Sequence, residues 1–147
     1  MRLKHSDADK ASDAFNDEFE KSTKTTVRQA AQSAQREILS TGAFKGTSLR
    51  RSFKVTQVGP YEQELSTQRK HASYVEDGTE PHKIRARNAK VLRFVQSGET
   101  VFRKVVNHPG TKPTKFFQTA TENASQKMIR DLDANAHRLA GKFNKKE

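Results

Sequence analysis

Four of the five histidines of this chain could serve as metal ligands. They are His71, His82, His108 and His137. Metal-binding histidines often recur at H-x3-H or HExxH spacing, and neither spacing occurs here. We therefore expect solvated or locally hydrogen-bonded histidines. His108 lies in a loop rich in proline and glycine, and it is expected to fix that loop by a hydrogen bond or to contact a partner.

Glu76 and Asp77 are adjacent carboxylates that could do acid–base work. Such a pair has to converge on one cleft with its two pKa values pushed apart. Neighbouring side chains on an extended chain point to opposite sides, so a turn-fixing role or a salt bridge to the arginines of residues 85–93 is expected instead.

Several classes of enzyme lack their signature in this chain. It contains no cysteine, which excludes a cysteine nucleophile, disulfides and thiolate metal sites, and which fits a reducing compartment. No G-x-S-x-G, P-loop or G-x-G-x-x-G motif occurs, and the isolated glycines are typical of turns. The sequence therefore predicts that the protein is not an enzyme and carries no metal or cofactor.

Seven basic residues gather in the middle of the chain, with Phe94 and Phe102 among them. That composition is similar to a nucleic-acid surface with stacking rings. Both phenylalanines are spaced as core residues, so a solvated or subunit-facing surface is favoured over a nucleic-acid surface. The seven residues are Lys83, Arg85, Arg87, Lys90, Arg93, Arg103 and Lys104.

Composition predicts a small hydrophobic core. Of 147 residues, 32% are hydrophobic and 31% are charged, and the net charge is +11. Residues 47–112 carry 13 basic and 6 acidic side chains, so most of the excess lies there and attracts acidic or polyanionic partners. The apolar residues recur at regular spacing. We therefore expect many of them to be buried against neighbouring subunits.

The start of the chain and its hydropathy predict a soluble protein without membrane association. The first ten residues hold no apolar run of the kind that a signal peptide needs. No apolar stretch approaches the ~18 residues that a membrane-spanning helix requires.

Two long helices are predicted at the ends of the chain. The first covers about residues 6–40 and has apolar residues at helical spacing on either side of a threonine-rich gap at 21–26, where it is expected to bend or split. The second covers about residues 113–142, with Pro113 in its first turn. Its apolar stripe is Phe117, Ala120, Ala124, Met128, Leu132, Ala136, Leu139 and Phe143.

Four or five antiparallel strands are predicted between the helices, over about residues 48–106. Alternation of period two covers residues 49–56, 61–66, 91–95 and 101–106, and Gly98 is available for a hairpin turn at 96–99. Both faces of the hairpin predicted over residues 91–106 carry apolar groups, which predicts that this hairpin is central or covered on both sides. The predicted fold class is α+β, as a single domain over residues 1–147 with one antiparallel sheet.

Three pieces of sequence resemble one known family. The first is Tyr74-Val75-Glu76 followed by Gly78-Thr79, and the second is IRARNAKVLRF from Ile84 with the G-x-x-V-F that begins at Gly98. The third is HPGTKP from His108, followed by the opening of the last helix. In this order they resemble the tail-completion or head–tail joining family of long-tailed bacteriophages. Asp77 stands where that family has an aromatic residue, and Ala86 stands in place of a proline. The N-terminal helix is similar in type but carries no motif.

The resemblance implies a structural protein of the virion neck, assembled in the host cytoplasm. It implies a subunit that forms a homo-oligomeric ring, with a hexamer expected first and a dodecamer next. Its partners would be the head connector (adaptor or stopper proteins) and the tail tube or tail terminator proteins, with non-specific contact to DNA in the lumen. A closed ring requires head-to-tail interfaces, which would account for the small core.

On this interpretation the loop at residues 107–113 is a stiff docking element, because two prolines limit its freedom. The turn at 96–99 is a further candidate, and replacing Pro109-Gly110 by Ala-Ala is expected to leave a folded subunit that fails to join heads to tails. The docking candidates are Tyr74, Glu76, Gly78, Thr79, His108, Pro109, Gly110, Thr111, Lys112 and Pro113.

Three alternatives stay open. One is a head-side adaptor or stopper protein of the same neck, and another is a basic DNA-binding module that rests on the charge of +11. The third, a small enzyme such as a nuclease, lacks a convergent set of Asp, Glu and His residues.

Overall fold

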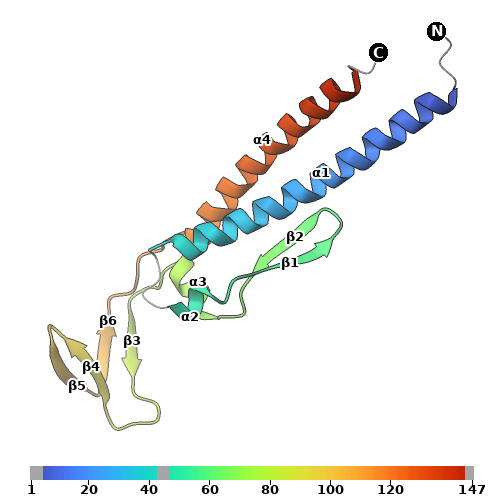
Figure 1. Ribbon diagram of the computed structural model, residues 1–147. Coiled ribbons are helices and arrows are strands. Elements are labelled where there is room, and N and C mark those ends of the chain that lie inside the picture. The colour runs from blue at the N-terminus through green and yellow to red at the C-terminus, as the bar shows by residue number, and fades with distance from the viewer. Residues whose placement is uncertain (1–4, 43–46, 145–147) are drawn as a thin grey trace. The chain divides into compact units, whose positions relative to one another are not determined.

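The computed structural model describes residues 5–42 and 47–144, and its fold is α+β with a long helix at each end (Figure 1). The chain divides into two compact units, which are described separately. The helical unit comprises Met1–Arg69 and Phe116–Glu147, and the strand unit comprises Lys70–Lys115. None of the described helices is both long and apolar enough to cross a membrane.

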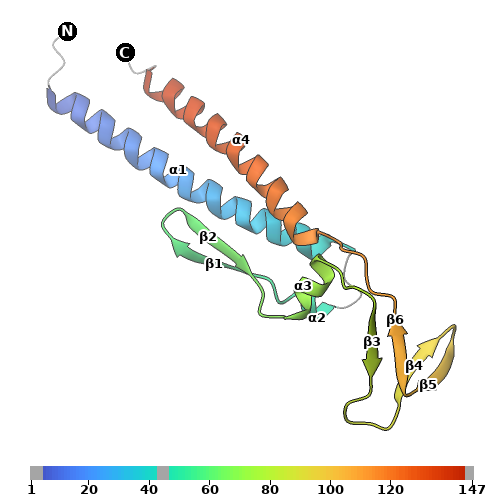
Figure 2. The same ribbon diagram turned by 180° about the vertical axis from the view of Figure 1, so that it is seen from behind.

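The helical unit is built on two antiparallel helices, α1 (His5–Ser40) and α4 (Phe116–Asn144), which lie side by side in Figures 1 and 2. Near one end the rings of Phe15 and Phe143 meet edge to face with centroids 5.3 Å apart. Near the other end Asn123 donates a hydrogen bond of 2.8 Å to Glu37. The predicted ends of both helices, at residues 6–40 and 113–142, are close to those observed.

The threonine-rich gap does not split α1, which is one helix of 36 residues. The hydroxyls of Thr23, Thr25 and Thr26 donate hydrogen bonds of 2.8, 2.8 and 3.0 Å to backbone carbonyls four residues earlier. Thr26 is buried and also accepts a bond of 3.1 Å from Asn135 of α4. The hydroxyls are thus satisfied without leaving the helix, and packing against α4 outweighs the modest propensity penalty.

A hairpin of β1 (Lys54–Gly59) and β2 (Glu62–Ser66) lies along α1 in both views. The strand predicted from residue 49 begins only at Lys54, because residues 47–50 form a helical turn, α2 (Thr47–Arg50). The Ser52 amide and hydroxyl donate bonds of 3.0 and 2.6 Å to the Leu49 carbonyl, and these local bonds compete with a strand ladder.

The buried hydrophobic residues of the described chain all belong to the helical unit. Phe53 packs edge to face on Phe116, with ring centroids 5.7 Å apart, and Gln35 of α1 donates a 2.8 Å bond to the Phe53 carbonyl. This arrangement joins the start of β1 to both helices. The buried set is Ala34, Ile38, Leu49, Phe53, Phe116, Ala120, Ala124 and Leu139.

The strand unit contains α3 (His71–Glu76), β3 (His82–Arg85), β4 (Leu92–Gln96), β5 (Glu99–Arg103) and β6 (Val105–His108). β4 pairs with β5, and β3 pairs with β6, both antiparallel. With β1–β2, the described residues thus form three two-stranded ladders rather than the single sheet of four or five strands that the alternation predicts. The physical reason is a break at Lys104, where the chain leaves β4 and pairs with β3 instead.

The hairpin turn of the strand unit forms as expected, since Ser97 and Gly98 have φ of 52° and 87° and two positive φ values suit a tight hairpin turn. Its expected cover is not observed. No residue of Lys70–Lys115 is buried, and Val95 and Phe102 are 70% and 55% exposed.

Candidate docking interface

Two loops of the strand unit cross and hold each other, and we call residues 75–80 together with 108–115 the clasp. Thr79 and Thr111 form an isolated antiparallel bridge in which each amide donates a 3.0 Å bond to the carbonyl of the other. Their hydroxyls lie 3.0 Å apart, at hydrogen-bonding distance. Segments 32 residues apart in sequence are thus fixed to each other at both backbone and side-chain level.

Each loop contributes a glycine that the opposite loop covers. Gly78 has φ of 74°, and a Cβ there would lie 2.4 Å from the Thr111 carbonyl oxygen. Gly110 has φ of 85°, and its Cβ would lie 2.2 Å from the Thr79 carbonyl oxygen. Real Cβ atoms do not approach backbone so closely, and positive φ disfavours other residues. Both glycines are therefore required for the crossing.

The clasp also terminates α3. The Thr114 hydroxyl and amide donate bonds of 2.7 and 3.2 Å to the Val75 carbonyl, and the Lys115 amide donates a 3.1 Å bond to the Glu76 carbonyl. The last carbonyls of a helix have no partner inside it, so these donors satisfy groups that would otherwise face solvent. Lys115 itself has φ of 50°, and α4 starts only at Phe116, three residues later than its predicted start at Pro113.

Asp77 pairs with Lys115, with Nζ 2.7 Å from Oδ1, and not with an arginine of residues 85–93 as one interpretation expected. The hydrogen bond to Asp77 is the largest influence that raises the pKa of Lys115 above its ordinary value. Both side chains are at least half exposed, so the pair orients the clasp more than it stabilises it.

His108 fixes its loop, as the sequence predicts. Its Nδ1 accepts a 3.1 Å bond from the Gly110 amide. Its ring stacks on that of His82, the residue opposite it in the β3–β6 ladder, with centroids 5.0 Å apart. His82 Nδ1 donates a 2.8 Å bond to the Glu80 carbonyl. Within residues 5–42 and 47–144, no three His, Asp or Glu side chains are placed to hold a metal ion.

The structure brings the two predicted docking segments, 74–79 and 108–113, together. Some of their groups hold the two segments to each other, and other side chains face solvent. The backbone and glycines of the clasp are used internally, so they are not open to a partner. Five of the candidates are exposed, and of these Thr111 is already bonded to Thr79 in the clasp. The exposed side chains left for a partner are Tyr74, Pro109, Lys112 and Pro113. The Ala-Ala replacement at Pro109-Gly110 is therefore no longer expected to leave the strand unit folded, because Gly110 has no room for a Cβ.

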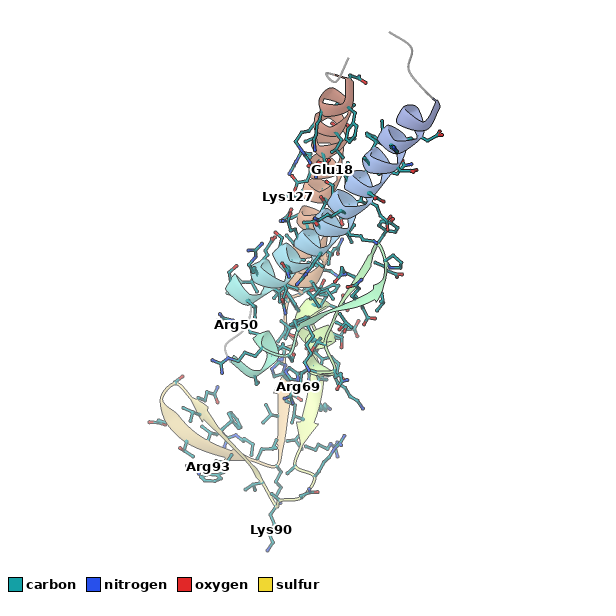
Figure 3. All side chains as sticks on the ribbon, turned by 45° about the vertical axis from the view of Figure 1, so that its right-hand side comes forward. Glu18, Arg50, Arg69, Lys90, Arg93 and Lys127 are labelled. Carbon is teal, nitrogen blue, oxygen red and sulfur yellow. The ribbon has the colours of Figure 1, made fainter. Side chains whose placement is uncertain are left out.

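The seven basic residues all belong to the strand unit and are exposed. Lys83 and Arg85 share one face of β3, Arg87 and Lys90 follow in bends, and Figure 3 shows Lys90 pointing away from the ribbon. The other three residues, Arg93, Arg103 and Lys104, lie on β4, on β5 and at the break that follows β5. Within the described part of the chain none of the seven forms an ion pair, so their charge faces outward.

One face of the β4–β5 hairpin combines a charge with exposed apolar groups. Arg93 is opposite Phe102, and Val95 is opposite Thr100, so all four side chains project on the same side. We call these four residues the hairpin face. The alternation predicts that Phe102 is a core residue, but its side chain is exposed. A signal in the sequence could have indicated this exposure. The predicted turn at 96–99 places Arg93 opposite Phe102, and a charged residue on that face argues against a buried one.

The helical unit carries an open groove of about 340 Å3 between α1, α4 and the β1–β2 hairpin. Its walls include small residues from both helices, such as Ala31, Ala34 and Ala124, with Met128 beside them. Tyr61 and Glu62 line it from the hairpin. The helical stripe in the sequence predicts these alanines as core, but it does not reveal that short side chains leave space between the helices.

The chain was compared with protein families, curated proteins and solved structures. A family model described as "Bacteriophage HK97-gp10, putative tail-component" matches residues 6–78, about half of the chain. No curated protein and no solved structure matches the chain. The match covers α1 to α3 and ends in the first piece of the resemblance, at Gly78, so it falls mainly where the sequence offered no motif. Through this match the chain belongs to the HK97 gp10-like family of bacteriophage tail components.

Proposed function

We propose that this tail component acts in the virion neck, in tail completion and head–tail joining. It assembles as a homo-oligomeric ring at the head-proximal end of the tail and docks the tail to the head connector. The observation that carries the proposal is the strand unit, which is internally fixed by the clasp yet buries none of its residues. An ordered surface with exposed aromatic and basic groups is what a docking element needs, because little entropy is lost on binding.

The ring itself is supported by the distribution of apolar surface. The described core is confined to the helical unit, while exposed apolar side chains occur on both units, among them Tyr61, Val95 and Phe102. Copies of the chain can cover such surfaces, and a head-to-tail contact that closes makes a ring. A hexamer is expected first and a dodecamer next. The partners are the head connector and the tail tube or tail terminator proteins, with the basic residues facing acidic neighbours or DNA in the lumen.

The direct test is a phage in which this reading frame carries a conditional stop codon. Under restrictive conditions we expect filled heads and tails without the proposed ring to accumulate separately, counted by electron microscopy of the lysate. Supplying the chain from a plasmid is the control and restores joined particles. Normal numbers of joined, infectious particles without the chain would refute the proposal.

A head-side adaptor or stopper protein is the nearest alternative, and fractionation separates it from a tail-completion protein. Tails purified from an infection that makes no heads should carry the chain, as detected by immunoblot. If the chain is found only on heads from an infection that makes no tails, the adaptor or stopper assignment replaces ours.

A DNA-binding module is the second candidate, favoured by the seven outward-facing basic residues of the strand unit. Filter binding of the purified chain to duplex DNA across a salt series tests it. For the neck protein we expect weak binding that DNA sequence does not change. A free DNA-binding module predicts tight binding, with affinity that falls steeply as salt rises, because each neutralised phosphate releases counterions.

A further inference from the structure

We propose that the groove of the helical unit receives the hairpin face of a second copy of this chain, with Phe102 and Val95 as the inserted side chains. The inference rests on the proposed ring and names the contact that builds it. The groove and the hairpin face lie on different units of the same chain. A surface that fits a different surface on the next copy makes a head-to-tail contact, the kind that generates rings.

The groove and the hairpin face match in size. The groove offers about 340 Å3. A cavity of about 150 Å3 already accommodates a benzene ring, so the groove has room for the ring of Phe102 and the branched side chain of Val95 together. A phenylalanine buries about 150–250 Å2 when it is fully enclosed, and Phe102 still exposes 55% of its surface. The pair therefore acts as an anchor within a larger interface of ~800 Å2 per partner.

The two surfaces also match in charge. Among the residues that line the groove, Glu62 is the charged one, although the chain as a whole carries +11. On the hairpin face, Arg93 is the charged residue, directly across from Phe102. Both Glu62 and Arg93 are exposed. With the phenyl ring in the groove, an arginine beside it can reach a carboxylate at the rim, and such a pair fixes the register of the contact.

The absence of cysteine makes the contact directly measurable. One copy carries Thr100→Cys, which lies on the hairpin face and leaves Phe102 and Val95 in place, and the other carries Ser125→Cys, which lines the groove on α4. Both variants are produced in the same infected cells and treated with a short bifunctional thiol reagent. We expect a cross-linked dimer. The matched control replaces Ser125→Cys by Ile129→Cys, a 64% exposed position four residues further along the same helix that does not line the groove. It should give at least tenfold less dimer.

Charge exchange in the same single-cysteine pair supplies a second readout. Arg93→Glu in the copy with the hairpin cysteine, or Glu62→Arg in the copy with the groove cysteine, should reduce the cross-linked dimer, and the two exchanges together should restore it. All of these positions are exposed, so the variants should fold, which circular dichroism checks.

The outcomes separate this inference from the proposed function. If the chain is present in purified particles but the two single-cysteine copies give no more dimer than the Ile129→Cys control, the inference is overturned and the proposed function stands. If the dimer forms but the chain is missing from particles, the contact is supported and the neck assignment fails. A chain that carries both cysteines and links only to itself would assign the groove to its own hairpin, which also overturns the inference.

Discussion

Replacing Gly78 with alanine tests whether the clasp holds the strand unit as the structure indicates. A non-glycine residue in the left-handed region costs about 1–2 kcal/mol. The new Cβ would also lie 2.4 Å from the Thr111 carbonyl oxygen, so the two loops must separate. Their two backbone hydrogen bonds, each 3.0 Å long, are then lost at about 0.5–1.5 kcal/mol apiece. Together these effects destabilise the clasp by about 2–5 kcal/mol.

Amide hydrogen exchange is the appropriate assay, because the strand unit has no buried residue and can open without unfolding the helical core. The Thr79 and Thr111 amides donate the bridge bonds and report its opening. We expect Gly78→Ala to reduce their protection about 30-fold or more, since each 1.4 kcal/mol is about tenfold. Gly110→Ala should have the same effect, because its Cβ would meet the Thr79 carbonyl oxygen.

Gly98→Ala is the matched control. Gly98 also has positive φ, at 87°, but nothing lies within 4 Å of the position its Cβ would take. It should therefore carry the backbone cost of about 1–2 kcal/mol alone, at the hairpin turn, and should leave the Thr79 and Thr111 amides unchanged. Equal behaviour of Gly78→Ala and Gly98→Ala at those two amides would refute the reasoning about the crossing.

Three further predictions concern the core, the ion pair of the clasp and the docking surface. Phe53→Ala should lower the free energy of unfolding by about 3–5 kcal/mol in urea titrations, because it removes a buried ring that packs on Phe116; a loss below about 1 kcal/mol would show that this ring is not core. The pKa of Lys115 is raised above 10.5 by its bond to Asp77, so the pair favours folding below pH 10.5 and is lost as pH rises through the higher folded value. Asp77→Asn should return this pKa toward 10.5 in an NMR titration, and an unchanged pKa would contradict the assignment. Lys112→Glu should reduce the yield of joined particles about tenfold, whereas Arg130→Glu, a charge reversal at another exposed residue on α4, should not; equal yields would remove Lys112 from the docking surface.

The sequence predicts the helices of this fold well and the pairing of its strands poorly. The stripes around Phe15 and Leu139 have clear helical spacing, and both helices are found near their expected ends. Period two locates extended segments, but it does not show which segments pair. The break at Lys104 moves residues 105–108 to β3, and no local signal marks it.

At the candidate site, too, the sequence predicted some features and missed others. The motif pieces at 74–79 and 108–113 were selected on resemblance, and the structure joins them through Thr79 and Thr111. Sequence alone could not assign Gly78 and Gly110 to internal packing, because their need for glycine comes from a contact 32 residues away. Phe102 was predicted as core because alternation reports spacing and does not report whether a second layer covers the strand.

The most direct test of the central claim is joining in vitro with the purified chain. Heads and tails are isolated separately from infections that lack this protein, mixed, and counted as infectious particles with and without added chain. The account predicts that adding the chain restores infectious particles in proportion to the number of tails, and that pre-incubation with tails is effective. A mixture that joins equally well without the chain, or that stays unjoined when folded chain is added, would contradict the account.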